Sequence, residues 1–140
     1  MVIHGEIRLR TDEKRSMVDI TSRVREALEQ SGIHAGMALI FVPGATGALS
    51  TIEFEPGLQR DFPALMEKLI PRREVYHHNE TWGDGNGHSH LRATLLGPSL
   101  TIPVRDGALM LGAWQQIVFL EFDNRPRERR LVIQFMGEIS

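Results

Sequence analysis

The stretch AWQQIVFLEFD, residues 113–123, is apolar on both of the faces that an extended chain would present. Because side chains alternate sides along a strand, this pattern predicts a long strand with two hydrophobic faces. The two faces would carry Trp114, Val118, Leu120 and Phe122 on one side, and Ile117 and Phe119 on the other. We therefore expect Trp114 in the core, and Gln115 and Gln116 satisfying polar groups at a sheet edge.

The segments on either side of this stretch predict two more pieces of sheet. Residues 100–104 and 108–111 flank Arg105-Asp106-Gly107, and an Asp-Gly turn between two such runs favours a β-hairpin. Residues 124–129 are polar and predict a turn, and residues 130–137 predict the closing strand.

The first half of the chain alternates strands and helices. Residues 2–10 alternate apolar and polar, which predicts a strand with one solvated face. Residues 37–42 form a continuous apolar run, which predicts a buried strand. Asp19 or Thr21 would cap a helix that Gly32 ends. Further elements are expected as a strand at residues 50–55 and helices at residues 58–70 and 91–96.

Together these elements predict a single α+β domain over residues 1–140. About three short helices would cover a largely antiparallel sheet system. The antiparallel expectation rests on consecutive strands being joined by tight turns rather than by helical crossovers.

Composition narrows the classes of function. The chain of 140 residues is 41% hydrophobic and carries a net charge of −2, so it has no basic excess to attract nucleic acid. It has no cysteine, which excludes disulfides, thiolate nucleophiles and thiolate metal sites. The longest apolar runs are strand-sized, and Glu6, Arg8 and Arg10 interrupt the N-terminal segment. These features predict a cytoplasmic protein that neither enters a membrane nor binds nucleic acid.

The most unusual segment is YHHNETWGDGNGHSH, residues 76–90, which gathers histidines, carboxylates and amides around glycines. Ligand-binding groups often lie on such loops. Imidazole and carboxylate without thiolate suit zinc, manganese or another divalent ion, and the oxygen ligands suit magnesium. The spacing matches no strong zinc motif, so a solvated loop, or histidines hydrogen-bonded in the core, are the alternatives.

Within this segment, His88 and His90 cannot both serve one site if they lie on a helix. Side chains two positions apart on a helix point in directions that differ by roughly 200°. We favour His90, because it adjoins the apolar run and would be held in place more firmly.

Other charged groups are less specific. Glu53 with Glu55, and Glu121 with Asp123, form carboxylate pairs that are able to bind metal or act as acid and base, although such pairs more often face solvent. Four arginines around the turn at residues 124–129 would neutralise a phosphate or, more commonly, form a charged hairpin tip: Arg125, Arg127, Arg129 and Arg130.

Four separated blocks carry a resemblance to a known family. They are DGNGHSH at residues 84–90, LGPSLTIP at 96–103, LGAWQQ at 111–116 and EFDNRPRERR at 121–130. These blocks, in this order, resemble the YjbQ family, whose members are described as secondary thiamine-phosphate synthases. The resemblance spans essentially the whole chain.

The resemblance implies a mixed β-sandwich with helices, assembled as a homotrimer, with its site at or near subunit contacts. It also implies a weak ability to join a pyrimidine pyrophosphate to a thiazole phosphate. Residues of this chain that match the family's motifs are His78, Asp84, Asn86, His90, Glu53 and Gln115.

Such a reaction must neutralise a departing pyrophosphate. His78, Asp84 and His90 would hold a divalent metal, zinc or magnesium, for this purpose. His90, Asp84 and Asn86 are the expected catalytic residues. Arg92 and Arg125 would join Glu53 and Gln115 in binding substrate. 

One departure separates this chain from many relatives, which carry a histidine where it has Gly44, followed by Ala45 and Thr46. A non-catalytic trimeric module that binds a metal or a small anionic metabolite is therefore the alternative to an enzyme, and hydrolysis of a phosphoester is a third reading.

Overall fold

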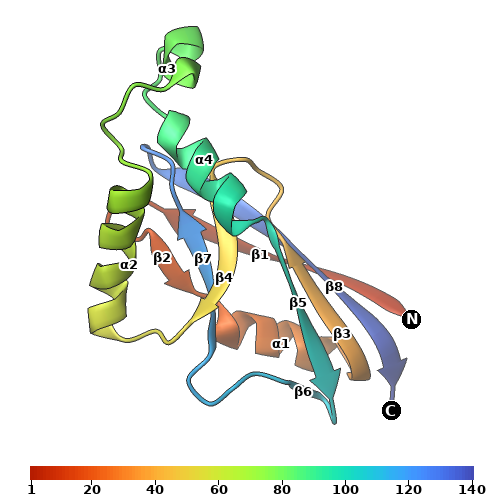
Figure 1. Ribbon diagram of the computed structural model, residues 1–140. Helices are drawn as coiled ribbons and strands as arrows, with labels where there is room; N and C mark the ends of the chain where they lie inside the picture. The colour runs from red at the N-terminus through yellow and green to blue at the C-terminus, as the bar shows by residue number, and fades with distance from the viewer.

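The computed structural model describes all residues from 1 to 140 and contains two antiparallel sheets (Figure 1). The larger sheet has the order β1-β8-β3-β5-β6. Its strands are β1 (Val2–Thr11), β8 (Arg127–Ile139), β3 (Ile33–Phe41), β5 (Ser99–Arg105) and β6 (Ala108–Leu109). The smaller sheet has the order β2-β7-β4. Its strands are β2 (Met17–Asp19), β7 (Gln116–Glu121) and β4 (Gly47–Ile52).

Four helices complete the molecule: α1 (Thr21–Ser31), α2 (Pro56–Leu69), α3 (His77–Trp82) and α4 (Gly87–Leu96). In Figure 1, α2 and α4 lie beside the small sheet, and α3 projects beyond the end of α4. None of the helices is long and apolar enough to cross a lipid bilayer.

The central strand of the small sheet explains the layering. Ile117 and Phe119 of β7 pack into the main core between the two sheets and α1. Val118 and Leu120, on the other face of β7, pack into a second core beneath α2 and α4. All four side chains are at most 2% exposed, and each contributes about 1.5–3 kcal/mol of hydrophobic stabilisation. The prediction of a strand with two hydrophobic faces is confirmed.

Local signals for the end of one helix and for one hairpin turn also behave as predicted. Gly32 ends α1 with a φ of 71°, as predicted, but the N-cap is Ile20 rather than Asp19 or Thr21, and the Asp19 carboxylate accepts from the Thr21 backbone N–H one residue ahead of the cap. The β5–β6 hairpin turns at Asp106 and Gly107, whose φ angles of 52° and 72° suit a tight turn with two left-handed residues.

The antiparallel arrangement is correct, but the reason given for it from sequence is wrong. Only β5 and β6 pair as consecutive strands. Every other ladder joins strands that are separated in the chain, such as β1 with β8 and β4 with β7. Two short elements, β2 and α3, were not predicted, and there are four helices instead of about three.

Two hydrophobic predictions need correction. Trp114 is not in the core but 75% exposed, because β7 begins only at Gln116 and the preceding loop leaves the ring uncovered. The run at residues 37–42 is buried on one face only. Met37 and Phe41 are 44% and 39% exposed, because no helix or second sheet covers the outer face of the large sheet.

Candidate functional site

Two short helices bring together three of the predicted site residues. His78 on α3 and His90 on α4 have ring centroids 4.5 Å apart, with ring planes inclined at 45°. Asp84 lies in the loop between the helices, and its Oδ1 is 3.6 Å from Nδ1 of His78. We call His78, Asp84 and His90 the histidine cluster. His78 is its centre, since it contacts both other members.

Glycines and one amide shape the turn between α3 and α4. Gly83 ends α3 in the left-handed conformation with a φ of 68°, which residues other than glycine rarely adopt. The Asn79 Oδ1 accepts a hydrogen bond of 2.8 Å from the Gly87 backbone N–H, which ties the end of α3 to the start of α4. A Cβ atom on Gly87 would lie 2.7 Å from Cβ of Tyr76, so only glycine lets the segment ahead of α3 pack this closely.

Asn86 shapes the start of α4 with one end of its side chain. Its Oδ1 accepts a hydrogen bond of 2.6 Å from the Ser89 hydroxyl. The amide nitrogen of Asn86 has no partner in the protein and is therefore a free donor beside the cluster.

The His78 imidazole lacks a hydrogen-bond partner at one nitrogen, as does the imidazole of His88. The Nδ1 of His78 is buried and has no hydrogen-bond partner, since the Asp84 carboxylate lies beyond hydrogen-bond distance. An unpaired buried ring nitrogen costs free energy, which a ligand, a proton or a small closing movement would recover. In the present geometry, no three imidazole or carboxylate groups converge on a single point as metal ligands would.

His88 lies on another side of α4, away from the cluster. It is 1% exposed and lines a cavity of about 230 Å³ between α2, α4 and the small sheet. Burial lowers the pKa of His88, and the positive charges of Arg92 and Arg72 lower it further. The divergence of His88 and His90 on a helix is thus confirmed, and His88 is the one histidine of the segment that is a core residue.

A buried ion pair lies at the end of the small sheet. Arg129 of β8 donates from Nε to Glu121 Oε2 of β7 at 2.7 Å, and the two side chains are 4% and 1% exposed. Thr11 donates to the same carboxylate at 2.7 Å, and Thr46 Oγ1 accepts from Arg129 Nη2 at 2.7 Å. Every charge in this group therefore has hydrogen-bond partners, as a buried pair requires.

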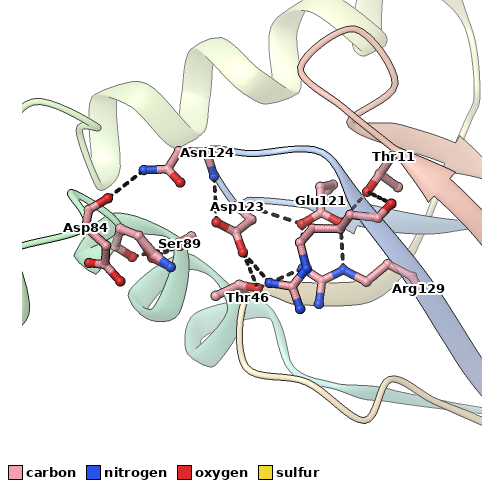
Figure 2. A network of polar contacts seen from close by, with 10 residues as sticks. Thr11, Thr46, Asp84, Ser89, Glu121, Asp123, Asn124 and Arg129 are labelled. Atoms are coloured by element: carbon pink, nitrogen blue, oxygen red, sulfur yellow. Dashed lines mark hydrogen bonds and ion pairs between the residues drawn. The ribbon is translucent and has the colours of Figure 1, made fainter. Parts of the chain in front are cut away.

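Asp123 continues this network toward the histidine cluster. Its Oδ1 accepts a hydrogen bond of 2.8 Å from the Asn124 backbone N–H, and Arg127 binds its Oδ2. Burial alone would raise the pKa of Asp123, but the bonds from Asn124, Arg127 and Thr46 outweigh it, so the pKa is lowered. Asn124 Nδ2 then donates to the backbone oxygen of Asp84 at 2.9 Å. Figure 2 shows Asn124 between Asp84 and Asp123.

These residues correct two sequence-based predictions. Glu121 and Asp123 are not solvent-facing, and Arg129 is not part of an exposed hairpin tip. The alternation of side chains along β8 could have predicted the burial of Arg129, because Arg129 lies on the same inward face as the buried Leu131 and Ile133. This strand was predicted to begin at residue 130, so Arg129 was assigned to the turn and its inward direction was missed.

Gly44, where the resemblance to the family leads us to expect a histidine, lies beside this pair. A Cβ on Gly44 would be 3.1 Å from Arg129 Nη1. A side chain there would contact the buried arginine directly, and this chain leaves that approach to Arg129 open.

The predicted substrate-binding residues lie apart from the cluster. Gln115 donates to the Thr51 hydroxyl at 3.0 Å, and the exposed Glu53 follows just after β4. These residues are at the opposite end of β4 and β7 from Glu121, on the order of 20 Å away by the rise of a strand. Glu55 is not paired with Glu53 on a strand, because its carboxylate caps α2 by accepting from two backbone N–H groups.

The two predicted substrate-binding arginines, Arg92 and Arg125, differ in whether the protein holds their guanidinium groups. Arg92 is 11% exposed, and its guanidinium donates to the Ile70 backbone oxygen at 2.9 Å and pairs with Glu67 at 2.9 Å. It therefore fastens α4 to the end of α2. Arg125 is exposed, follows Asn124 directly and forms no ion pair, so its guanidinium is not held by the protein.

Comparison with known proteins agrees with the blocks noted in the sequence. The family model described as "UPF0047 protein YjbQ-like" matches residues 5–138. A UPF0047 protein of Archaeoglobus fulgidus is 42% identical over 129 residues, covering 92% of this chain and 98% of the relative. One of Methanothermobacter thermautotrophicus is 41% identical over 133 residues, covering 95% and 91%.

Solved structures share the fold. The crystal structure of a YbjQ-like protein of unknown function from Sulfolobus solfataricus has a TM-score of 0.93 at 36% identity and covers 99% of both chains. A hypothetical protein from Aeropyrum pernix has a TM-score of 0.91 at 34% identity, covering 97% of this chain and 99% of the other. The α+β fold and the sequence blocks agree, and this chain belongs to the YjbQ/UPF0047 family.

Proposed function

We propose that this protein is a metal-dependent enzyme of the thiamine-phosphate synthase type, or one that acts on a related phosphorylated metabolite in the cytoplasm. The observation that carries the proposal is the histidine cluster. Two imidazoles and a carboxylate from different elements approach within contact distance, and one of their nitrogens is buried without a partner.

His78, Asp84 and His90 are the residues that would hold the metal. Their donor set of two nitrogens and an oxygen suits zinc better than magnesium, which prefers oxygen ligands throughout. The buried Nδ1 of His78 has no partner in the protein, and a cation there would satisfy it, although the three side chains would have to move closer together to converge on one ion. When bound, the metal would supply Lewis-acid stabilisation of negative charge on a departing pyrophosphate.

The chain's own residues would do the remaining work. The half-buried His90 would transfer a proton through its imidazole, and the Asp84 carboxylate, 3.6 Å from His78 Nδ1, would add a negative charge beside that ring. The free amide nitrogen of Asn86 donates to a phosphate oxygen, and Arg125 adds a guanidinium from the following turn.

The outer face of the large sheet supports a homotrimer. Met37, Phe41 and Met136 are 44%, 39% and 49% exposed on neighbouring strands, although the sequence pattern of β3 is that of a covered strand. A second and third copy would bury this strip. Such an assembly would also give Glu53 and Gln115 a route to the site, because within one chain they lie far from the histidine cluster.

The test combines metal content with turnover. Purified protein should contain zinc by elemental analysis and form thiamine phosphate from the pyrimidine pyrophosphate and the thiazole phosphate. Asp84→Ala and His90→Ala should each lower activity by at least about a hundredfold, the scale expected for losing a proton-transfer group or a metal ligand. Glu80→Ala is the matched control, since this exposed carboxylate of the same segment pairs only with His77. Equal activity in all variants would reject the assigned roles.

A second candidate is a non-catalytic trimeric module that binds a metal or small anionic metabolite. The observation that favours it is Gly44, which places no side chain beside Arg129, where the resemblance to the family leads us to expect a histidine. Tight binding of zinc without turnover of the thiamine precursors, or of phosphoesters in a broad screen, would support this module over the enzyme.

A further inference from the structure

A second polar surface lies away from the histidine cluster, along the edge strand β1. There a groove of about 810 Å³ runs between β1, β8, β2 and the first turn of α1. Eleven residues line it, and six of them are arginines: Arg8, Arg10, Arg15, Arg23, Arg129 and Arg130. Only two lining residues, Asp19 and Glu128, are acidic. A chain with a net charge of −2 thus concentrates positive charge in one place.

The arginines are only partly neutralised by the protein. Arg10 pairs with Glu128 at 2.8 Å, while Arg8 and Arg130 share the single carboxylate of Glu6 at 2.9 Å and 3.6 Å. These pairs are exposed, so water screens them and each is worth little. The pKa of Glu6 is lowered by its bond to Arg8 and the nearby charge of Arg130, which agrees with a positive local potential.

Of the other three arginines, Arg129 is buried and already paired with Glu121, whereas Arg15 and Arg23 have no carboxylate partner. Arg15 forms no ion pair, and Arg23 donates only to the backbone oxygen of Arg8 at 2.9 Å. Asp19 keeps its negative charge but forms no ion pair with these arginines, and its carboxylate accepts from the backbone and hydroxyl of Thr21. The groove therefore holds guanidinium groups with free donors.

We infer that this arginine groove binds a small polyphosphorylated ligand, at a site separate from the histidine cluster. Guanidinium groups bind phosphate oxygens in a planar, two-pronged geometry, and all six basic residues here are arginine rather than lysine. The volume holds several linked phosphate groups. No aromatic side chain lines the groove, so it lacks the stacking platform that single-stranded nucleic acid requires. Leu9 and Val18 are its only hydrophobic members, which offers little to the side chains of a peptide.

The test measures binding of inorganic tripolyphosphate by titration calorimetry at low salt. Arg15→Ala combined with Arg23→Ala removes two charge-assisted contacts and should weaken binding at least about tenfold. Arg73→Ala combined with Arg105→Ala is the matched control, because both arginines are exposed, lie outside the groove and form no ion pair. Thermal melting of each variant verifies that it is folded. Absence of binding to the wild type, or equal binding by both double variants, would overturn the inference.

Two further arms separate this site from its alternatives. Combined His78→Ala and His90→Ala substitutions should leave tripolyphosphate binding within about twofold of wild type, whereas its loss would place the anion at the histidine cluster and overturn the inference. A single-stranded oligonucleotide and a poly-glutamate peptide should both bind more weakly than tripolyphosphate. Tighter binding of either one would reject the small-ligand assignment.

Discussion

The histidine cluster and the buried Arg129–Glu121 pair are joined through Asn124 but are built in opposite ways. The cluster is partly exposed, lies on two short helices, and leaves a buried nitrogen of His78 without a partner. The Arg129–Glu121 pair is almost fully buried, and threonine hydroxyls complete its hydrogen bonds. A satisfied buried pair is rigid, whereas an unsatisfied, lightly packed group retains free energy for binding. This difference is the reason why we propose the cluster as the ligand site and the pair as its rigid support.

Breaking the buried Arg129–Glu121 pair should produce the largest loss of stability. Glu121→Gln leaves the Arg129 guanidinium buried without its counter-charge, and removing one partner of such a pair costs about 3–5 kcal/mol. The free energy of unfolding from urea denaturation measures this loss. Glu128→Gln is the control, because its pair with Arg10 is exposed and should cost no more than about 1 kcal/mol. Similar losses for the two variants would mean that Arg129 finds water or another partner.

Adding a side-chain carbon at the turn between α3 and α4 should have an intermediate effect on stability. In Gly87→Ala, the new Cβ would lie 2.7 Å from Cβ of Tyr76, and overpacking of this kind costs about 1–3 kcal/mol. Alanine is the better helix former by about 1 kcal/mol, so a net loss would show that the contact outweighs propensity. Urea denaturation measures the net effect, and zinc titration should show weaker binding. Gly5→Ala is the control because its Cβ would have no neighbour within 4 Å, and an unchanged Gly87→Ala variant would argue against the tight α3–α4 packing.

Cutting the link between the two regions should have the smallest effect on stability. Asn124→Ala removes the hydrogen bond to the Asp84 backbone, which is worth about 0.5–1.5 kcal/mol. Its informative consequence is local: the ring resonances of His78 and His90 should shift in NMR spectra. Arg125→Ala, at the next and exposed position, should leave these resonances in place. If Asn124→Ala leaves them unmoved as well, Asn124 does not position the loop.

Prediction from sequence succeeded where the cause is local. The Asp106-Gly107 turn, the end of α1 at Gly32 and the opposed directions of His88 and His90 follow from the conformations of a few adjacent residues. It failed where burial depends on distant partners. Trp114 belongs to an apolar stretch yet is exposed, and Arg129 belongs to a polar stretch yet is buried, because neither environment is set by neighbours in the chain.

The sequence by itself determined the alternation of β7, the class of the fold, and which polar segment carries imidazole and carboxylate groups. Periodicity and turn chemistry encode these features, since they act over a few residues. Only the tertiary structure decided that β8 pairs between β1 and β3, which faces Arg129 toward Glu121 of the other sheet. It also decided that six arginines meet along one groove. Strand order depends on the packing of whole sheets, and no local pattern in the chain records it.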